Sequence, residues 1–195
     1  MGISASSEVA AEETIDLQRE FESSLKLAQK LLIRLQSLIH TFKQERLSGS
    51  YMPLFHDWSM LPKVELKFQE WLHISDAQRL RFLAESCEDY KNLLDQVYAY
   101  EHDKGDPALS ESIDNASLDL RDLLHHIHLQ MSVLGVDAHR VGQSRVLGNI
   151  LKQKSIWGIY EKAFLILKSI EQFVQRAVRD YTVLRSSAKR NAGLH

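Results

Sequence analysis

Three histidines within four residues are the side chains whose types and spacing come nearest to metal chemistry. His125 and His128 lie three residues apart, so one face of a helix would present both imidazoles. A zinc site needs at least three protein ligands, and the sequence offers no third ligand at a matching spacing. We therefore interpret His125, His126 and His128 as part of a solvated polar face, and we expect no bound metal.

The other catalytic patterns are absent from the sequence. A di-iron bundle needs two Glu-x-x-His units and two further inward carboxylates, whereas this chain has one such unit, Glu70 to His73. There is no glycine-rich phosphate loop, no paired-cysteine metal motif and no Gly-x-Ser-x-Gly turn. No spacing couples a nucleophile to a base. We predict no catalytic residues, no cofactor and no enzymatic activity.

Large aromatic side chains outside the expected core suit a protein interface instead. Trp157 lies near the start of the last predicted helix, three residues before Tyr160, and Trp71 lies near the end of a long predicted loop. Tryptophan and tyrosine are frequent anchors of protein interfaces. The alternative, left open at this point, is that Trp71 and Trp157 seal the ends of a helical bundle.

A second candidate surface lies further along the last predicted helix. Phe173 immediately precedes the expected core position Val174, so we expect it to border the surface. Arg176 and Asp180 follow three and seven residues later and share its helix face. Arg176 and Asp180 could instead form an ordinary surface ion pair, which would contribute under about 0.5 kcal/mol.

Four long segments must position these residues. Glycine and proline number only 8 and 3, and apolar residues recur at alternating spacings of three and four, which indicates amphipathic helices. In the first segment this stripe includes Phe21, Leu25, Ala28, Leu32 and Leu35. No segment alternates with period two, so we predict an all-α fold. The helices are expected at about Thr14–Leu47, Ser75–His102, Leu109–Leu134 and Lys152–Ser187.

The helix ends carry their own signals. Thr14 is expected to cap the first helix, and Ser75 with Gln78 forms a predicted capping box at the second. Gly135 is the expected C-terminal cap of the third helix.

The connections predict the topology. About 27 residues join the first two helices, about six join the second to the third, and about 16 join the third to the fourth. A short link makes antiparallel neighbours, whereas a link long enough to retrace a helix allows parallel ones. We predict a long-chain four-helix bundle, up-up-down-down with two long crossover loops. It forms a single domain over residues 1–195 with flexible tails at about 1–12 and 188–195.

Charge and termini narrow the class of protein. Lysine and arginine number 24 and aspartate and glutamate 26, a net charge of −2 that gives no reason to expect nucleic acid or an anionic membrane. The apolar runs are too short for membrane insertion. The single cysteine, Cys87, cannot form an intrachain disulfide. Residues 1–6 lack a basic start and an apolar stretch, so they are not a signal peptide. Three alternatives stay open: a signal peptide was removed, export is unconventional, or the protein stays inside the cell.

Several motifs resemble the interleukin-6 superfamily. Leu61-Pro62, Trp71, Asp76 and Arg79-Leu80 resemble the start of the second helix in its ciliary neurotrophic factor and cardiotrophin branch. Phe173-x-x-Arg176-x-x-x-Asp180 is similar to the Trp-x-x-Arg-x-x-x-Asp element of that branch. Leu123-Leu124, Met131 and Leu134-Gly135 resemble the end of its third helix.

This resemblance implies a secreted, monomeric cytokine that clusters cell-surface receptors. In this superfamily, the site formed by Trp71, Phe173, Arg176 and Asp180 would meet a non-signalling alpha receptor. The exposed faces of the first and third helices would meet the signal transducer glycoprotein 130. The start of the fourth helix would meet a second signalling chain.

One departure from the branch concerns that second chain. The branch has Phe-x-x-Lys where this chain has Trp157 and Tyr160. Phe-x-x-Lys is the element that the leukaemia inhibitory factor receptor recognises, whereas a tryptophan there resembles interleukin-6 and interleukin-11, which engage glycoprotein 130. The sequence therefore leaves open which of these two receptors meets the start of the fourth helix. Two rival hypotheses are an intracellular helical adaptor and an amphipathic lipid-binding bundle.

Overall fold

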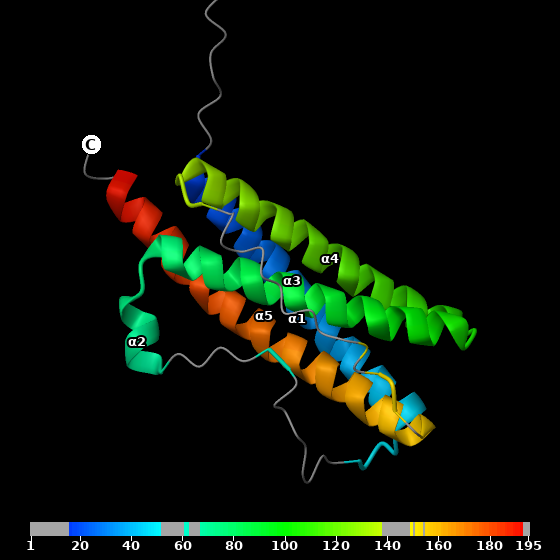
Figure 1. Ribbon diagram of the computed structural model, residues 1–195. Coiled ribbons are helices and arrows are strands. Elements are labelled where there is room, and N and C mark those ends of the chain that lie inside the picture. Colours follow the sequence, from blue (N-terminus) through cyan, green and yellow to red (C-terminus); the bar gives the residue numbers. More distant parts are fainter. Residues whose placement is uncertain are drawn as a thin grey trace, which may run out of the picture.

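The computed structural model describes residues 16–51, 61–62, 67–137, 149, 151–153 and 155–192, and this part of the chain contains no strand. Four long helices, α1 (Leu17–Arg46), α3 (Asp76–Asp103), α4 (Pro107–Val133) and α5 (Ile156–Ala192), pack as a bundle (Figure 1). A short helix, α2 (Phe68–His73), precedes α3 and was not predicted. The all-α four-helix bundle is confirmed.

The helix directions follow from Figure 1, in which α1 and α3 run one way along the bundle and α4 and α5 run back. The packing pairs are α1 with α5, α3 with α4, α1 with α4 and α3 with α5. Each of these pairs is therefore antiparallel. The predicted up-up-down-down topology is confirmed, because α1 and α3 are parallel to each other and α4 and α5 run in the opposite direction (Figure 1).

The helix ends agree only in part with the predicted caps. Ser75 Oγ accepts a bond from the Gln78 amide and Gln78 Oε1 accepts one from the Ser75 amide, so the capping box is confirmed. Gly135 has φ +62°, the left-handed geometry of a helix C-terminal glycine. Asp16, not Thr14, caps α1, with its carboxylate accepting from the Gln18 amide at 3.0 Å. Thr14 lies outside the described residues.

The tails are the second point of difference. Helix α5 begins at Ile156 and ends at Ala192, so residues 188 to 192, predicted to belong to a flexible tail, are helical. Lys189 and Arg190 in the last turn favour this extension, because cations stabilise the negative end of the helix dipole. The predicted N-terminal tail, 1–12, and the segment excluded as a signal peptide lie outside the described residues.

The core follows the predicted stripes with one correction in α1. Leu32 was predicted to be interior but is only partly buried, whereas Leu31 and Leu38 are buried. Both sets of positions satisfy three-and-four spacing, and α1 is rotated so that the stripe through Ala28, Leu31, Leu35, Leu38 and Phe42 faces inward. None of the described helices combines the length and apolar character that spanning a membrane requires.

A buried polar cluster fixes the relative positions of α1, α4 and α5. Tyr181 Oη donates to Gln130 Oε1 at 3.1 Å, and Gln130 Nε2 donates to Ser24 Oγ at 2.7 Å. All three side chains are fully buried, and burial raises the pKa of Tyr181 well above its usual range. Because an unpaired polar group there would cost roughly 1–3 kcal/mol, the cluster selects one register of these helices.

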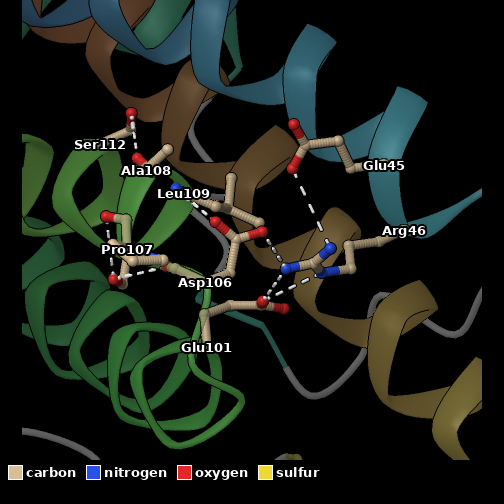
Figure 2. Close-up of polar contacts among 9 residues, drawn as sticks. Glu45, Arg46, Glu101, Asp106, Pro107, Ala108, Leu109 and Ser112 are labelled. Atoms are coloured by element: carbon tan, nitrogen blue, oxygen red, sulfur yellow. Dashed lines mark hydrogen bonds and ion pairs between the residues drawn. The ribbon is translucent and has the colours of Figure 1, made fainter.

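A second network closes the opposite end of the bundle. Arg46 in the last turn of α1 donates to Glu101 Oε2 at 2.7 Å and to Asp106 Oδ2 at 2.7 Å (Figure 2). Asp106 also caps α4 by accepting from the Leu109 amide. One guanidinium therefore joins the end of α1 to the end of α3 and the start of α4. These carboxylates raise the pKa of Arg46 above its usual range, so it stays charged.

The single cysteine points into the core. Cys87 is fully buried, and burial raises its thiol pKa to about 12. At pH 8 only about one thiol in 10,000 would be ionised, and the thiolate is the reactive form. We expect a disulfide reagent such as dithionitrobenzoate to label Cys87 more than a hundredfold more slowly in the native protein than in urea. Equal rates would show that this side chain is accessible.

Candidate functional site

Helix α5 carries predicted site residues at its start and just past its midpoint. Trp157 lies in the first turn, and Arg176 and Asp180 follow 19 and 23 residues later. At 1.5 Å per residue these positions are separated by about 30 Å along the axis. The predicted residues therefore form two separate surfaces.

The first surface lies where α2, the start of α3 and the C-terminal half of α5 meet. Trp71 Nε1 donates to Asp180 Oδ1 at 2.6 Å, and Arg79 donates to the same oxygen at 2.5 Å. Arg176 Nε lies 3.4 Å from the other carboxylate oxygen of Asp180. We call this the α2 corner and define it by Phe68, Trp71, Leu72, Arg79, Arg176 and Asp180. The structure thus brings together three of the predicted residues, Trp71, Arg176 and Asp180.

Burial distinguishes their roles. Arg79 and Asp180 are each 1% exposed, so Asp180 serves as an internal partner and the pair Arg176–Asp180 is not an ordinary surface ion pair. Arg79 also donates to the Trp71 carbonyl at 2.9 Å and stacks its guanidinium over the indole at 4.8 Å. Asp180 and Arg79 therefore hold Trp71 in place.

The exposed part of the α2 corner is apolar. Phe68 is 67% exposed and stacks on Trp71 with ring centroids 5.8 Å apart, and Leu72 is 48% exposed. No residue of α2 is buried, so the polar contacts of Trp71 are the main attachment of this short helix to the bundle. Sequence reasoning missed Phe68 and Leu72, although their spacing with Trp71, i, i+3 and i+4, describes one helical face.

Arg176 is the cation at the edge of this surface. Burial lowers its pKa, Asp180 opposes that effect, and the neighbouring charges of Arg79 and Arg179 lower it further. Two guanidinium groups, those of Arg79 and Arg176, therefore share one carboxylate, and Arg179 adds a third positive charge close enough to act on Arg176. The local excess of positive charge would be relieved by an acidic group on a binding partner.

Phe173 does not border the surface, and that prediction is wrong. Its side chain is 5% exposed, and its ring lies 5.2 Å from that of Tyr90 on α3. Tyr90 in turn donates to the Pro62 carbonyl at 2.8 Å. Helix α3 covers the side of α5 next to Val174, so the buried arc is wider than the stripe alone indicated. Phe173 therefore packs between α5 and α3, where a binding partner cannot reach it.

The second surface is the start of α5. Ile156 is 56% exposed and Trp157 is 47% exposed, so Trp157 does not seal the bundle. Its ring meets the edge of Tyr51 at 5.7 Å, and Tyr51 donates to Glu161 at 2.8 Å. The pKa of Tyr51 is raised to about 12, mainly by burial and to a lesser extent by this hydrogen bond. We call Tyr51, Ile156 and Trp157 the α5 entry patch.

Tyr160, predicted beside Trp157, faces another direction. It is partly buried and its ring packs edge-on against Phe42 at 6.4 Å and Tyr100 at 6.2 Å. Arg46 lies 5.9 Å above the same ring. Tyr160 therefore anchors the start of α5 to the ends of α1 and α3, and Trp157 is the more accessible of the two.

A third surface lies between α1 and α4. A groove of about 410 Å³ is lined by Ile33 and Thr41 of α1 and by Ser112 and Asn115 of α4, among others. Ile33 is 70% exposed, the most exposed large apolar side chain in the described residues. Ile33 directly follows the expected core position Leu32, so its place outside the predicted stripe is the sequence signal for this exposure.

The histidines of α4 do not come together with further ligands. Within the described residues, no group of three or more His, Cys, Asp or Glu side chains is arranged to hold a metal ion. His126 Nδ1 lies 3.4 Å from Glu20 Oε2, which pairs α4 with the start of α1.

Known proteins that are similar to this chain over most of its length indicate its family. No protein-family model matches the chain. The chain is 30% identical over 183 residues to interleukin-27 subunit alpha of Sus scrofa, an alignment that covers 87% of this chain and 75% of that relative. It is 27% identical over 190 residues to interleukin-27 subunit alpha of Homo sapiens, with the same shares covered.

Proposed function

Because this chain belongs to the interleukin-27 subunit alpha family of four-helix-bundle cytokines, we propose that it signals by gathering several receptor ectodomains around one rigid bundle. The family assignment makes the protein an extracellular cytokine that acts through receptors and not an enzyme. These relatives do not favour the alternative of an intracellular helical adaptor.

The observation that carries the proposal is the exposed Trp157 at the start of α5, with the α2 corner just past the middle of the same helix. Two anchors about 30 Å apart on one helix suit two different receptor chains. Holding those chains together raises the effective concentration of their cytoplasmic parts, so each contact alone can be weak. The cytokine need not change conformation.

We assign each surface a partner from the superfamily resemblance. The α5 entry patch binds a signalling receptor of the glycoprotein 130 or leukaemia inhibitory factor receptor type. The groove between α1 and α4, with Ile33 beside it, binds glycoprotein 130. Lys30 and Arg34 pair with Asp119 at 2.9 and 3.0 Å beside this groove, which fixes α1 against α4 there.

The α2 corner binds a protein that does not itself signal. Phe68 and Leu72 supply exposed apolar area and Arg176 supplies positive charge. The superfamily resemblance indicates an alpha receptor. The relatives' name describes a subunit, which favours a companion subunit as the second candidate for the same surface. Either partner would need an acidic group opposite Arg176.

A pull-down against a panel of receptor ectodomains, with candidate companion subunits added singly, tests the proposal. We expect at least one signalling receptor of the glycoprotein 130 type to be captured. Absence of every receptor in the panel, together with silence on cells that express each pairing, would refute receptor clustering.

Replacing Arg176 by alanine should weaken binding at the α2 corner by roughly tenfold or more, because arginine anchors of this kind typically contribute over 1 kcal/mol. Arg79 still neutralises Asp180 in this variant, so the free energy of unfolding should fall by less than the roughly 3–5 kcal/mol expected when a buried charge loses its only partner. Surface plasmon resonance with the captured alpha receptor or subunit measures the first effect and urea denaturation the second. Unchanged affinity would remove Arg176 from the interface.

A further inference from the structure

The cations of α5 are concentrated in its C-terminal part. From Gln172 to Ala192 the helix carries five lysine or arginine residues and one acidic residue, Asp180. Asp180 is buried and already paired with Arg79 and Arg176. The net charge of −2 for the whole chain therefore conceals a strongly basic end of one helix.

Four of these cations make no ion pair within the described residues: Arg179, Arg185, Lys189 and Arg190. Many cations elsewhere in the described helices do have carboxylate partners, such as Lys26 with Glu22 and Lys91 with Asp95. Arg179, Lys189 and Arg190 are exposed and Arg185 is half-buried. We call these four residues the basic cluster of α5.

Helix geometry places the basic cluster on one side of α5. At 100° per residue, Arg179 and Arg190 lie about 20° apart around the axis, and Arg185 and Lys189 about 40° apart. The four positions together span about 140° around the helix and about 16 Å along it. This is an elongated cationic strip.

The helix dipole explains only part of this arrangement. Lys189 and Arg190 lie in the last turn, where cations stabilise a helix end. Arg179 and Arg185 lie 13 and 7 residues before the last helical residue, Ala192, beyond the reach of that effect. Arg179 also adds to the repulsion that lowers the pKa of Arg176. Positive charge accumulates here without an internal partner.

We propose that the basic cluster of α5 binds a linear sulfated polysaccharide. An elongated strip of exposed cations fits a chain of repeated anionic groups, and the extracellular location of this cytokine favours cell-surface polysaccharide over nucleic acid or the anionic inner leaflet. Binding of this kind concentrates the cytokine at the cell surface before it meets a receptor. The inference does not depend on which receptors are engaged.

Immobilised heparin and the purified full chain at about 0.15 M salt, where exposed charges interact over about 8 Å, provide the test. The triple variant Arg185→Ala, Lys189→Ala, Arg190→Ala should bind about a hundredfold more weakly, or roughly fivefold per cation. Alanine favours helix, so circular dichroism should show an unchanged helix content. The charge-preserving variant Arg185→Lys, Arg190→Lys should lose much less affinity than the triple variant, because it keeps both positive charges and gives up only the bidentate guanidinium fork.

The matched control removes three exposed cations from other places, as Lys26→Ala, Lys104→Ala and Arg121→Ala. It has the same net charge as the triple variant and should retain most of its heparin affinity. If the triple variant and the control lost equal heparin affinity, net charge alone would explain the effect and the proposal would be overturned. Unchanged heparin affinity of the triple variant would also overturn it. Equally strong binding to phosphatidylserine vesicles, or to unsulfated hyaluronan, would overturn the choice of a sulfated polysaccharide. No receptor is present, so receptor clustering can fail without affecting this result.

Discussion

Replacing Trp157 by alanine should abolish signalling, with a loss of roughly a hundredfold or more in potency, as central tryptophan anchors show in other interfaces. The side chain is 47% exposed and its one ring contact in the described residues is the edge of Tyr51. The free energy of unfolding should therefore fall by only about 1 kcal/mol, or about 2–4 °C in melting temperature. Transcription-factor phosphorylation in receptor-bearing cells measures the first effect and calorimetry the second.

The controls separate a receptor contact from a fold contact. Trp157→Phe keeps an aromatic ring and should recover most of the activity. Leu134→Ala removes an apolar side chain that is 41% exposed and belongs to none of the three proposed surfaces, so it should signal normally. Binding of Trp157→Ala at the α2 corner should also stay intact. If Trp157→Ala lost several kcal/mol of unfolding free energy, and signalling fell only in proportion to the fraction of folded protein, Trp157 would belong to the core.

The bundle could be predicted because several local signals agreed with one another. The capping box at Ser75, the glycine at Gly135 and the long, short and long connections all indicated the same four helices and the same topology. Helix α2 was missed because six residues are too few for periodicity to distinguish from a loop. The rotation of α1 was partly missed because two stripes with the same three-and-four spacing run along this helix, one through Leu31 and the other through Leu32. Only the contacts with α4 and α5 decide which of the two stripes faces inward.

The surfaces were predicted less well, because exposure depends on which neighbour covers a helix. Trp157 and Phe173 looked alike in sequence, yet Trp157 is half exposed and Phe173 is covered by α3. Asp180 lies on the helix face that was predicted to be exposed, and is buried because Arg79 and Trp71 close over it. These contacts join residues about 100 positions apart in sequence, and no spacing rule within one helix can supply them.

Replacing Asp180 by alanine should destabilise the protein by about 3–5 kcal/mol, because Arg79 would remain as a buried charge without its partner. Arg79 and Asp180 are each 1% exposed, and Trp71 Nε1 would lose its acceptor as well. Urea denaturation of the native chain and of the variant measures the effect. A change under about 1 kcal/mol would mean that water replaces the carboxylate and that the pair is not sealed from solvent.

Removing both partners of this ion pair separates stability from recognition. In Arg79→Met, Asp180→Leu the buried charge of Arg79 is removed together with its partner, and only Arg176, whose side chain is 15% exposed, loses a carboxylate. The variant should therefore recover most of the unfolding free energy that Asp180→Ala loses. Binding at the α2 corner should not return, because Trp71 would still lack its bond to Asp180 and its stack on Arg79. If binding did recover along with stability, the ion pair would be a packing element alone, and the exposed Phe68 and Leu72 would recognise the partner without it.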